Sequence, residues 1–532
     1  MLVARDVEVS VANGVRILGP VSLEVAPGSL VALMGASGSG KSTLLRVLAG
    51  IAAPTGGSAT WAEAATESEV KALGYVPQRE SVHDRLTTRE ALRYAASLRL
   101  NPHAEIEERV KTVLDELGLV GQADTRIQNL SGGERRRAAC GLELVGDPPV
   151  LLLDEPTSGL DAVLERRLMH LFARQADRGR AVLVATHASA SLVLCDEVIV
   201  IEAGLIAFRG SPPDAQRHLA AVADELGRGP VTGSVLAPPA PPPTPPPVAP
   251  EVRGAERDEN RPFGLELRVL TGRYLRTLTR DRRTLALLLG QAPVLGLLIA
   301  LVFRPGTLSS TSASPVNAIE VVFLLMTGSI WLGVTSASRE VVKERGLVER
   351  EFDVGVRLDA YVIAKALVLF ALNFVQVLWL TLVVVGLQPL GVGSGAVVEI
   401  FGLAVLTAWA SSAMGIAVSC AARSTDQAAG AVPLLLMPQL LLAGGLIPLA
   451  QMPRAIAGLA NLIYARWSFA GLASAAHVGA RLAAVDSSGI LGFDTRFFSL
   501  SPGTGAVILI GFTLVELLVA VFLLMRRPPV KA

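Results

Sequence analysis

Hydrophobic and polar positions follow three different patterns along this chain. Over residues 1–210, short apolar runs of strand length alternate with amphipathic helical stretches, which is typical of an α/β domain. Residues 211–262 are rich in proline, and such a segment forms a semi-rigid spacer rather than a core. Residues 285–532 contain repeated runs of about 20 apolar residues, the length that crosses a bilayer. The pattern predicts an α/β domain joined through a Pro-rich linker to an all-α membrane domain.

Six segments are apolar and long enough to be predicted membrane spans. They are approximately 285–303, 318–338, 360–386, 396–420, 428–447 and 504–525. Arginine and lysine gather between the second and third spans and after the sixth, whereas the loops after the first and third spans carry almost none. The positive-inside rule then places both termini in the cytoplasm, which predicts a multi-pass protein of the cytoplasmic (inner) membrane. On this topology residues 448–503 form the only sizeable external segment.

Residues 263–284, just before the first span, carry six arginines among Leu, Val and Tyr at helical spacing. Such a segment predicts an amphipathic interfacial helix that lies on the anionic lipid of the cytoplasmic leaflet. The composition supports a membrane protein, because a mean hydropathy of +0.49 with 18% charged residues is too apolar for an ordinary soluble chain. The three cysteines have no paired or metal-like spacing, which argues against a disulfide framework and a zinc site.

A glycine-rich loop follows the apolar run 30–34 and precedes a helical pattern at 44–48. Its G-x-x-x-x-G-K-S spacing is that of a phosphate-binding loop, in which backbone N–H groups and a helix N-terminus surround the phosphates of ATP or GTP. Lys41 is expected to reach the β- and γ-phosphates, and Ser42 to offer its hydroxyl to Mg²⁺. The residues expected to bind nucleotide are Gly35, Ala36, Ser37, Gly38, Ser39, Gly40, Lys41, Ser42 and Thr43.

Polar side chains follow three further predicted strands. Asp154 and Glu155 end the apolar run that starts at Val150, and the open edge of an α/β sheet is where ligands bind. We expect Asp154 to hold Mg²⁺ through water and Glu155 to polarise the attacking water. Gln78 follows another strand and is expected to ligate Mg²⁺, although such a residue is often only a solvated loop residue. His187, at the end of a strand over 181–186, is expected to contact the γ-phosphate rather than be merely structural.

A second anion site is predicted where a helix begins near Ser131. Ser131 can cap this helix, and the two glycines that follow expose its first N–H groups. A long helical insertion separates this site from the phosphate loop, so it is expected to grip the γ-phosphate of ATP bound to a second copy. The segment consists of Leu130, Ser131, Gly132, Gly133 and Glu134.

These motifs together resemble those of ATP-binding-cassette (ABC) transporters. GASGSGKST is similar to the Walker A motif, Gln78 to the Q-loop, LSGGE to the signature, LLLDEP to Walker B, and His187 to the switch histidine, all in family order. The turn after Walker B is similar to the D-loop and consists of Ser158, Gly159, Leu160 and Asp161. The resemblance implies an ABC cassette with a helical insertion, ATP and Mg²⁺ as cofactors, and a head-to-tail dimer that holds two ATP molecules.

The order of cassette, linker, basic helix and six spans resembles G-type (White-like) half-transporters and bacterial ABC-2-type exporters. This resemblance implies a homodimer that exports a lipid, a hydrophobic drug or a peptide. Two alternatives stay open: an importer, and a membrane-bound ABC ATPase that transmits force or signals without moving a substrate. A soluble ABC ATPase that acts on ribosomes or DNA is excluded by the membrane half, so no nucleic-acid partner is expected.

Charged and polar positions in the membrane half provide two further hypotheses. The segment Lys343–Glu351, between the second and third spans, is either a solvated loop or a short helix that couples the ATPase to the spans. The coupling residues would be Glu344, Arg345, Glu349 and Arg350. Glu516 lies near the middle of the last span and is either an intramembrane substrate site or a helix-packing group. For Asn373, Gln376 and Gln439, hydrogen bonding between helices is the favoured interpretation.

Overall fold

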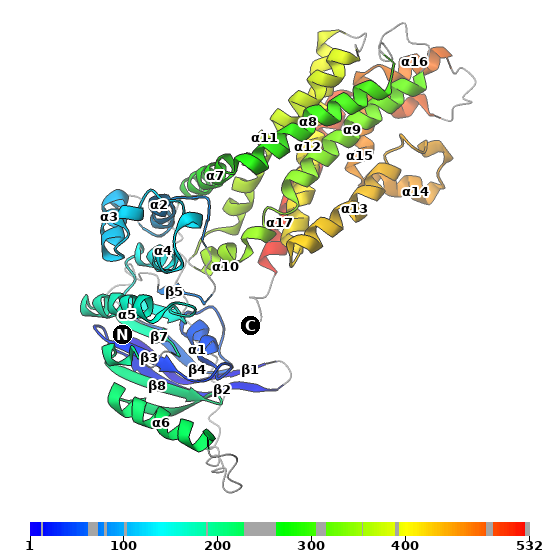
Figure 1. The fold of residues 1–532 in the computed structure, drawn as a ribbon. Helices are drawn as coiled ribbons and strands as arrows, with labels where there is room; N and C mark the ends of the chain where they lie inside the picture. The colour runs from blue at the N-terminus through cyan, green and yellow to red at the C-terminus, as the bar shows by residue number, and fades with distance from the viewer. Residues whose placement is uncertain are drawn as a thin grey trace. The chain divides into compact units, whose positions relative to one another are not determined.

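The computed structural model describes residues 1–11, 14–61, 73–78, 82–100, 104–187, 190–227, 262–304, 315–353, 355–388, 393–485 and 493–526. The chain separates into two units, one made largely of Met1–Asn260 and the other largely of Arg261–Phe352 and Val356–Pro528. Figure 1 shows strands with flanking helices in the first unit and helices alone in the second. Most of the predicted Pro-rich linker lies outside the described residues, but its first part forms helix α6 (Pro212–Gly227), which packs Ala215 into the core of the first unit.

Two sheets form the framework of the first unit. An antiparallel sheet has the order β2-β1-β4, and a six-stranded sheet has the order β5-β6-β7-β3-β8-β9 with β9 antiparallel. The bounds are β1 (Leu2–Ser10), β2 (Arg16–Val25), β3 (Leu30–Met34), β4 (Gly56–Trp61), β5 (Gly74–Val76), β6 (Val150–Asp154), β7 (Ala181–Ala185), β8 (Glu197–Glu202) and β9 (Leu205–Gly210). Strands β3, β6 and β7 are buried along their whole length, as expected of parallel strands covered on both faces. Because β5, β6, β7 and β3 are neighbouring parallel strands, their carboxyl ends meet at one edge.

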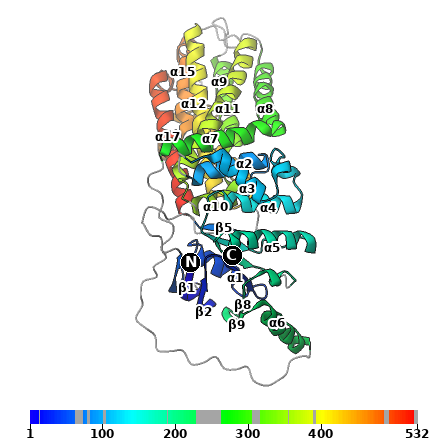
Figure 2. The same ribbon diagram turned by 90° about the vertical axis from the view of Figure 1, so that its left-hand side faces the viewer.

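Helices cover this sheet and form the predicted helical insertion. Their bounds are α1 (Lys41–Leu48), α2 (Thr88–Arg99), α3 (Ile106–Glu116), α4 (Gly132–Leu144) and α5 (Ala162–Asp177), with short 3-10 turns at Val120–Gln122, Ile127–Asn129 and Leu192–Leu194. Figure 2 shows α2, α3 and α4 gathered beside one another. They pack closely because Gly141 of α4 has no side chain: a Cβ there would lie 2.6 Å from Leu117 and 2.9 Å from Leu92. The α/β fold with a helical insertion is therefore confirmed.

The second unit is a bundle of helices built around α12. The bounds are α7 (Phe263–Arg280), α8 (Arg282–Val302), α9 (Pro315–Ala337), α10 (Arg345–Asp353), α11 (Leu358–Leu387), α12 (Ser394–Ala421), α13 (Thr425–Leu441), α14 (Arg454–Leu459), α15 (Tyr464–Ala475), α16 (Val478–Val485) and α17 (Pro502–Met525). The 3-10 turns are η4 (Val342–Glu344), η5 (Leu449–Gln451), η6 (Ala460–Leu462) and η7 (Thr495–Ser499). Helices α9 and α12 approach closely at Gly333, where a Cβ would lie only 2.2 Å from the carbonyl oxygen of Ala408. Small residues at a crossing are the usual way for membrane helices to pack.

Five stretches of the described residues are long and apolar enough to cross a membrane: Arg282–Val302, Val316–Phe352, Leu358–Leu387, Ser394–Ala421 and Pro502–Met525. The fifth predicted span, 428–447, is not confirmed. Its helix, α13, has 17 residues and ends at Leu441. Two features stop it: Pro433 and Pro438 remove backbone donors inside the helix, and Gly444 adopts a positive φ of 89° shortly after it.

The region predicted to be an external segment, 448–503, is in part a component of the bundle. Helix α15 packs against α12, α17 and α9, and its Tyr464 and Phe469 are buried in the core of the unit. The predicted interfacial helix also differs from expectation. Within α7, Arg273 points inward and is 5% exposed, whereas Arg268 and Arg276 are exposed. Helix α7 therefore contacts α11 through part of the face that we predicted to lie on lipid headgroups.

Candidate functional site

The phosphate loop lies between β3 and α1, as predicted. Gly35, Gly38 and Gly40 all have positive φ values, and a Cβ on Gly35 would lie 2.2 Å from the carbonyl oxygen of Ile201, so this turn requires glycine. Lys41 is buried and donates to the carbonyl oxygens of Gly35 and Ala36, each at 2.8 Å. The loop over 36–38 is exposed, and the first N–H groups of α1 follow it. This arrangement fits a bound phosphate chain.

Ser42 and Asp154 lie together at the carboxyl edge of the sheet. The Ser42 hydroxyl donates to Asp154 Oδ1 at 2.9 Å, and the Tyr75 hydroxyl lies 3.5 Å from Oδ2. Burial raises the pKa of Asp154, and the hydrogen bond from Ser42 opposes this rise. A hydroxyl oxygen beside a carboxylate is a suitable donor set for Mg²⁺, which prefers oxygen ligands and keeps several waters. The residues present therefore fit the predicted Mg²⁺ with ATP.

Glu155, Gln78 and His187 converge at the same edge. Gln78 Nε2 donates to Glu155 Oε2 at 2.8 Å, and His187 Nδ1 lies 4.0 Å from the same oxygen. Glu155 has a φ of 46°, which is unusual for a residue other than glycine and is typical of functional turns. The His187 side chain is 63% exposed, so the group is open at the surface of the unit. This is where a water that attacks a γ-phosphate would be oriented.

Arg136, which the sequence analysis did not identify, holds together the two loops that form this edge. It is 5% exposed and donates to three carbonyl oxygens, those of Pro156, Gln78 and Glu155, each at 2.8 Å. The planar guanidinium thus bridges the two loops that carry Gln78 and Glu155. The only sequence signal was the basic run Arg135–Arg137, in which nothing indicates that the middle residue is the one turned inward.

The predicted signature begins α4. Ser131 caps the helix, and the Ser131 N–H donates to Glu134 Oε2 at 2.9 Å, which completes a capping box. This bond, together with that of the Ser131 hydroxyl, lowers the pKa of Glu134. Ser131 and Gly132 are exposed, so the helix N-terminus is open to a ligand from outside the unit. In the turn after Walker B, Asp161 caps α5 by accepting from the N–H groups of Val163 and Leu164.

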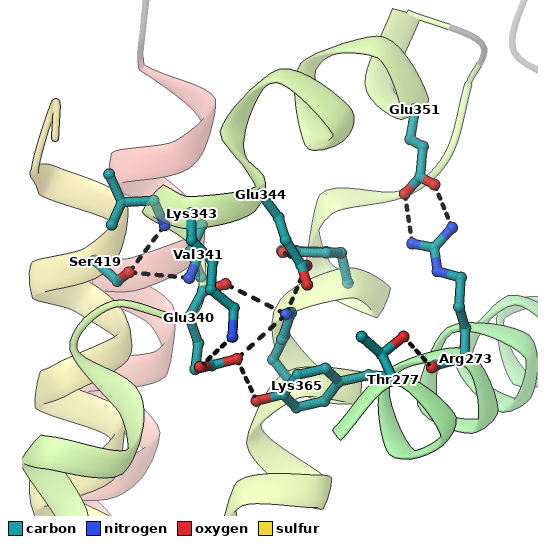
Figure 3. Close-up of polar contacts among 12 residues, drawn as sticks. Arg273, Thr277, Glu340, Val341, Lys343, Glu344, Glu351, Lys365 and Ser419 are labelled. Atoms are coloured by element: carbon teal, nitrogen blue, oxygen red, sulfur yellow. Dashed lines mark hydrogen bonds and ion pairs between the residues drawn. The ribbon is translucent and has the colours of Figure 1, made fainter. Parts of the chain in front are cut away.

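The charged segment Lys343–Glu351 is not a solvated loop. It forms η4 and α10, and Glu344 Oε2 lies 2.6 Å from Nζ of the buried Lys365 (Figure 3). Arg345 pairs with Glu349 at 2.9 Å along the segment, and Arg350 is 9% exposed. Several of its charges are thus bound inside the membrane unit, which we had not predicted.

Three of the four polar residues predicted at membrane depth make hydrogen bonds between or within helices. Asn373 Nδ2 donates to Gln376 Oε1 at 2.9 Å, Gln376 Nε2 donates to the carbonyl oxygen of Leu288, and Gln439 Oε1 accepts from the N–H of Ala465. Glu516 is also inside the bundle, and its Oε2, like Oδ1 of Asn373, is buried without a hydrogen-bond partner among the described residues.

Comparisons with known proteins agree with this arrangement. The family model described as ABC transporter matches residues 18–158, and the model described as ABC-2 type transporter matches residues 265–476. The two parts of the chain thus match the ATP-binding domain and the membrane domain of ABC transporters. The chain is 34% identical over 498 residues to the ABC transporter ATP-binding/permease protein Rv1747 of Mycobacterium tuberculosis, a match that covers 88% of this chain and 57% of that protein.

Matches to other relatives cover a smaller part of this chain. ABC transporter G family member 22 of Arabidopsis thaliana is 37% identical over 220 residues, which is 39% of this chain and 29% of the relative. A solved structure of CbiO1 from Clostridium perfringens, part of the ABC transporter complex CbiONQ, is 25% identical and covers 43% of this chain and 95% of its own, with a TM-score of 0.38. The matched region thus spans 57% of the Mycobacterium tuberculosis relative and 29% of the Arabidopsis relative.

Proposed function

We propose that this chain is an ATP-hydrolysing half-transporter that dimerises and exports a lipid, a hydrophobic drug or a peptide across the cytoplasmic membrane. The observation that carries the proposal is the convergence of Glu155, Gln78 and His187 at one edge of the sheet. Ser42 and Asp154 lie at the same edge. The described residues of the same chain include five helical stretches long enough to cross a membrane. Lys41 and the loop over 35–43 would hold the phosphates, and bound Mg²⁺ would neutralise charge on them. Glu155 would orient and polarise the attacking water.

Dimerisation is supported by the exposed N-terminus of α4. An exposed Ser131 and Gly132 leave backbone N–H groups available to the γ-phosphate of a second copy. Because every motif is present in this one chain, a homodimer would contain two complete sites. The alternatives are an importer and an ABC ATPase that acts in signalling or force transmission. The size of the membrane unit supports transport over signalling.

We also propose that the charged segment transmits closure of the cassettes to the membrane helices and that Glu516 belongs to the substrate path. An acidic side chain at membrane depth costs about 3 kcal/mol unless it is compensated, so a buried carboxyl oxygen without a partner supports a functional role. Both termini would lie in the cytoplasm, and the Pro-rich linker would act as a spacer.

The test is the ATPase rate of the purified protein in lipid vesicles, measured with a panel of lipids, peptides and hydrophobic drugs. Stimulation by one class, absent in Glu155→Gln, would support transport and identify the substrate class. A rate that no compound changes would contradict the transport proposal and favour the signalling alternative.

A further inference from the structure

A cluster of polar side chains joins α7, α11 and the corner between α9 and η4 in the membrane unit (Figure 3). We call it the Lys365 cluster, and it consists of Tyr274, Glu340, Glu344, Tyr361 and Lys365. Tyr274 comes from α7, Glu344 from η4, and Tyr361 and Lys365 from α11, while Glu340 lies between α9 and η4. None of these residues belongs to the nucleotide site, and only Glu344 was expected to have a role.

Lys365 is the centre of the cluster. Its side chain is 2% exposed, and its Nζ lies 2.6 Å from Glu344 Oε2 and 3.8 Å from Glu340 Oε2. The same ammonium donates to the backbone carbonyl oxygen of Glu340 at 3.3 Å and lies 3.7 Å from the centroid of the Tyr274 ring. The ammonium group of Lys365 therefore contacts Glu340, which precedes η4, and Glu344, which ends η4. It also contacts the aromatic ring of Tyr274 on α7.

The two phenols complete the cluster. The Tyr274 hydroxyl donates to Glu340 Oε2 at 2.6 Å, and the Tyr361 hydroxyl donates to Glu344 Oε2 at 3.1 Å. Burial raises the pKa of Tyr274 well above its usual value, so this phenol stays a donor at neutral pH. Glu340 thus accepts a hydrogen bond from α7, and Glu344 accepts one from α11. Both glutamates also contact Lys365.

Two further contacts hold the charged segment on either side of the cluster. Arg273 of α7 forms a two-bond ion pair with Glu351, in which Nη2 lies 2.7 Å from Oε2. The Ser419 hydroxyl of α12 accepts from the N–H groups of Val341 and Val342 at 2.9 and 3.0 Å. Ion pairs and hydrogen bonds are directional, so they fix the relative orientation of the elements that they join. These contacts therefore fix the segment against α7, α11 and α12.

We propose that Lys365 is a positioning residue that locks the charged segment to α7 and α11, so that a displacement of the segment moves these helices as one body. The inference rests on the proposed function, in which the segment transmits closure of the cassettes. The inference adds Lys365, on α11, as the residue through which a displacement of the charged segment would reach the membrane helices.

The test uses the full-length protein in lipid vesicles with Glu155→Gln, so that ATP traps the closed state. Pulsed electron spin resonance measures the distance between the two copies from one spin label on each. One chain carries Val120→Cys, which reports on the cassettes, and another carries Leu387→Cys at the end of α11; both positions are exposed. The native Cys140, Cys195 and Cys420 are buried, and chains without an introduced cysteine provide the background.

The decisive variant is Lys365→Met combined with Glu344→Gln. Removing one partner would leave a buried charge uncompensated, but removing both partners removes that cost, so the double variant should still fold. We expect its Val120→Cys distance to shift with ATP as in the parent chain. The ATP-dependent shift at Leu387→Cys should be lost, because α11 would no longer be tied to the charged segment through Lys365.

Two control variants separate positioning from a merely structural role. Lys365→Arg keeps the charge and should preserve the shift at α11. Lys343→Met removes a lysine that contacts the same Glu340 at 2.5 Å, but the side chain of Lys343 is 42% exposed and makes this contact close by along the chain, so the shift at α11 should not change. A full shift at α11 in the double variant would overturn the inference. Cassettes that close in the parent chain without any shift at α11 would instead overturn the proposed function on which it rests.

Discussion

Arg136 offers the sharpest test of how the catalytic edge is held. Its three hydrogen bonds at 2.8 Å join the carbonyl groups of Gln78, Glu155 and Pro156, although Arg136 itself lies on α4 and belongs to none of the predicted site motifs. In Arg136→Lys the charge remains, but one ammonium replaces a planar fork and cannot reach all three oxygens. We therefore expect Glu155 and Gln78 to lose their fixed separation.

The magnitude follows from the bonds that are lost. Hydrogen bonds from a charged donor contribute about 1.5–3 kcal/mol each, so losing two of the three would destabilise the ATPase by about 3–6 kcal/mol before relaxation. A misplacement of about 1 Å in a catalytic group can lower a rate about 100-fold, which is about 2.7 kcal/mol of barrier. Because these three hydrogen bonds end on the loops that carry Gln78 and Glu155, their loss should act on turnover, and the KM for ATP should change by no more than about twofold.

The assay is steady-state ATP hydrolysis by the purified protein, with kcat and KM measured separately and the thermal unfolding midpoint recorded. Arg135→Lys is the matched control, because Arg135 is the preceding residue and pairs with Asp84 at 2.7 Å while 30% exposed. It should hydrolyse ATP at the wild-type rate. If Arg136→Lys kept the wild-type kcat while remaining folded, the claim that this guanidinium positions Glu155 would be refuted.

Four further predictions concern single residues. Glu155→Gln should bind ATP but lose at least about 100-fold in turnover, since a general base contributes about 100- to 10,000-fold; normal hydrolysis would exclude Glu155 as the base. Lys41→Ala should weaken nucleotide binding at least tenfold, about 1.4 kcal/mol, in a fluorescent-nucleotide titration, and unchanged binding would disprove its phosphate contact. Ser131→Ala should cost about 1 kcal/mol of stability through the lost cap, seen as a lower unfolding midpoint of the ATPase. Gly333→Ala should destabilise the membrane unit by about 1–3 kcal/mol in denaturant titrations, because its Cβ would meet the Ala408 carbonyl; Gly290→Ala, with nothing within 4 Å, is the control.

The nucleotide site could be located from the sequence because its residues follow strand ends. Parallel strands align their carboxyl ends, so Asp154, Glu155, Gln78 and His187 are brought together once the strands are recognised. The buried strands β3, β6 and β7 are apolar runs, and the starts of α2, α4 and α5 carry capping residues. The contacts of Arg136 could not be predicted, because its partners are backbone carbonyls that any sequence supplies.

The membrane unit was harder to predict, since apolar helices give little information about which faces meet. Hydropathy located the helices, but it did not reveal that α13 ends early or that α15 packs into the core. The region 448–503 was interpreted as external because it lies between the fifth and sixth predicted spans. In the structure Tyr464 and Phe469 bury a short apolar face that is too brief to register as a span.

The charged segment shows why charge alone does not predict exposure, and this changes how its role should be tested. Its alternation of acids and bases is typical of a solvated helix, yet Glu344 faces a lysine that lies inside an apolar helix more than 20 residues later in the chain. Reversing the charge of Glu344 would therefore place a second cation beside the buried Lys365 and disturb the fold itself. Glu349 is 39% exposed and pairs only weakly along the segment, so its reversal leaves the Lys365 cluster intact. A defect in coupling caused by Glu349→Lys would hence report on contacts that the segment makes with another part of the protein, whereas a defect caused by Lys365→Met with Glu344→Gln would report on its attachment to the membrane helices.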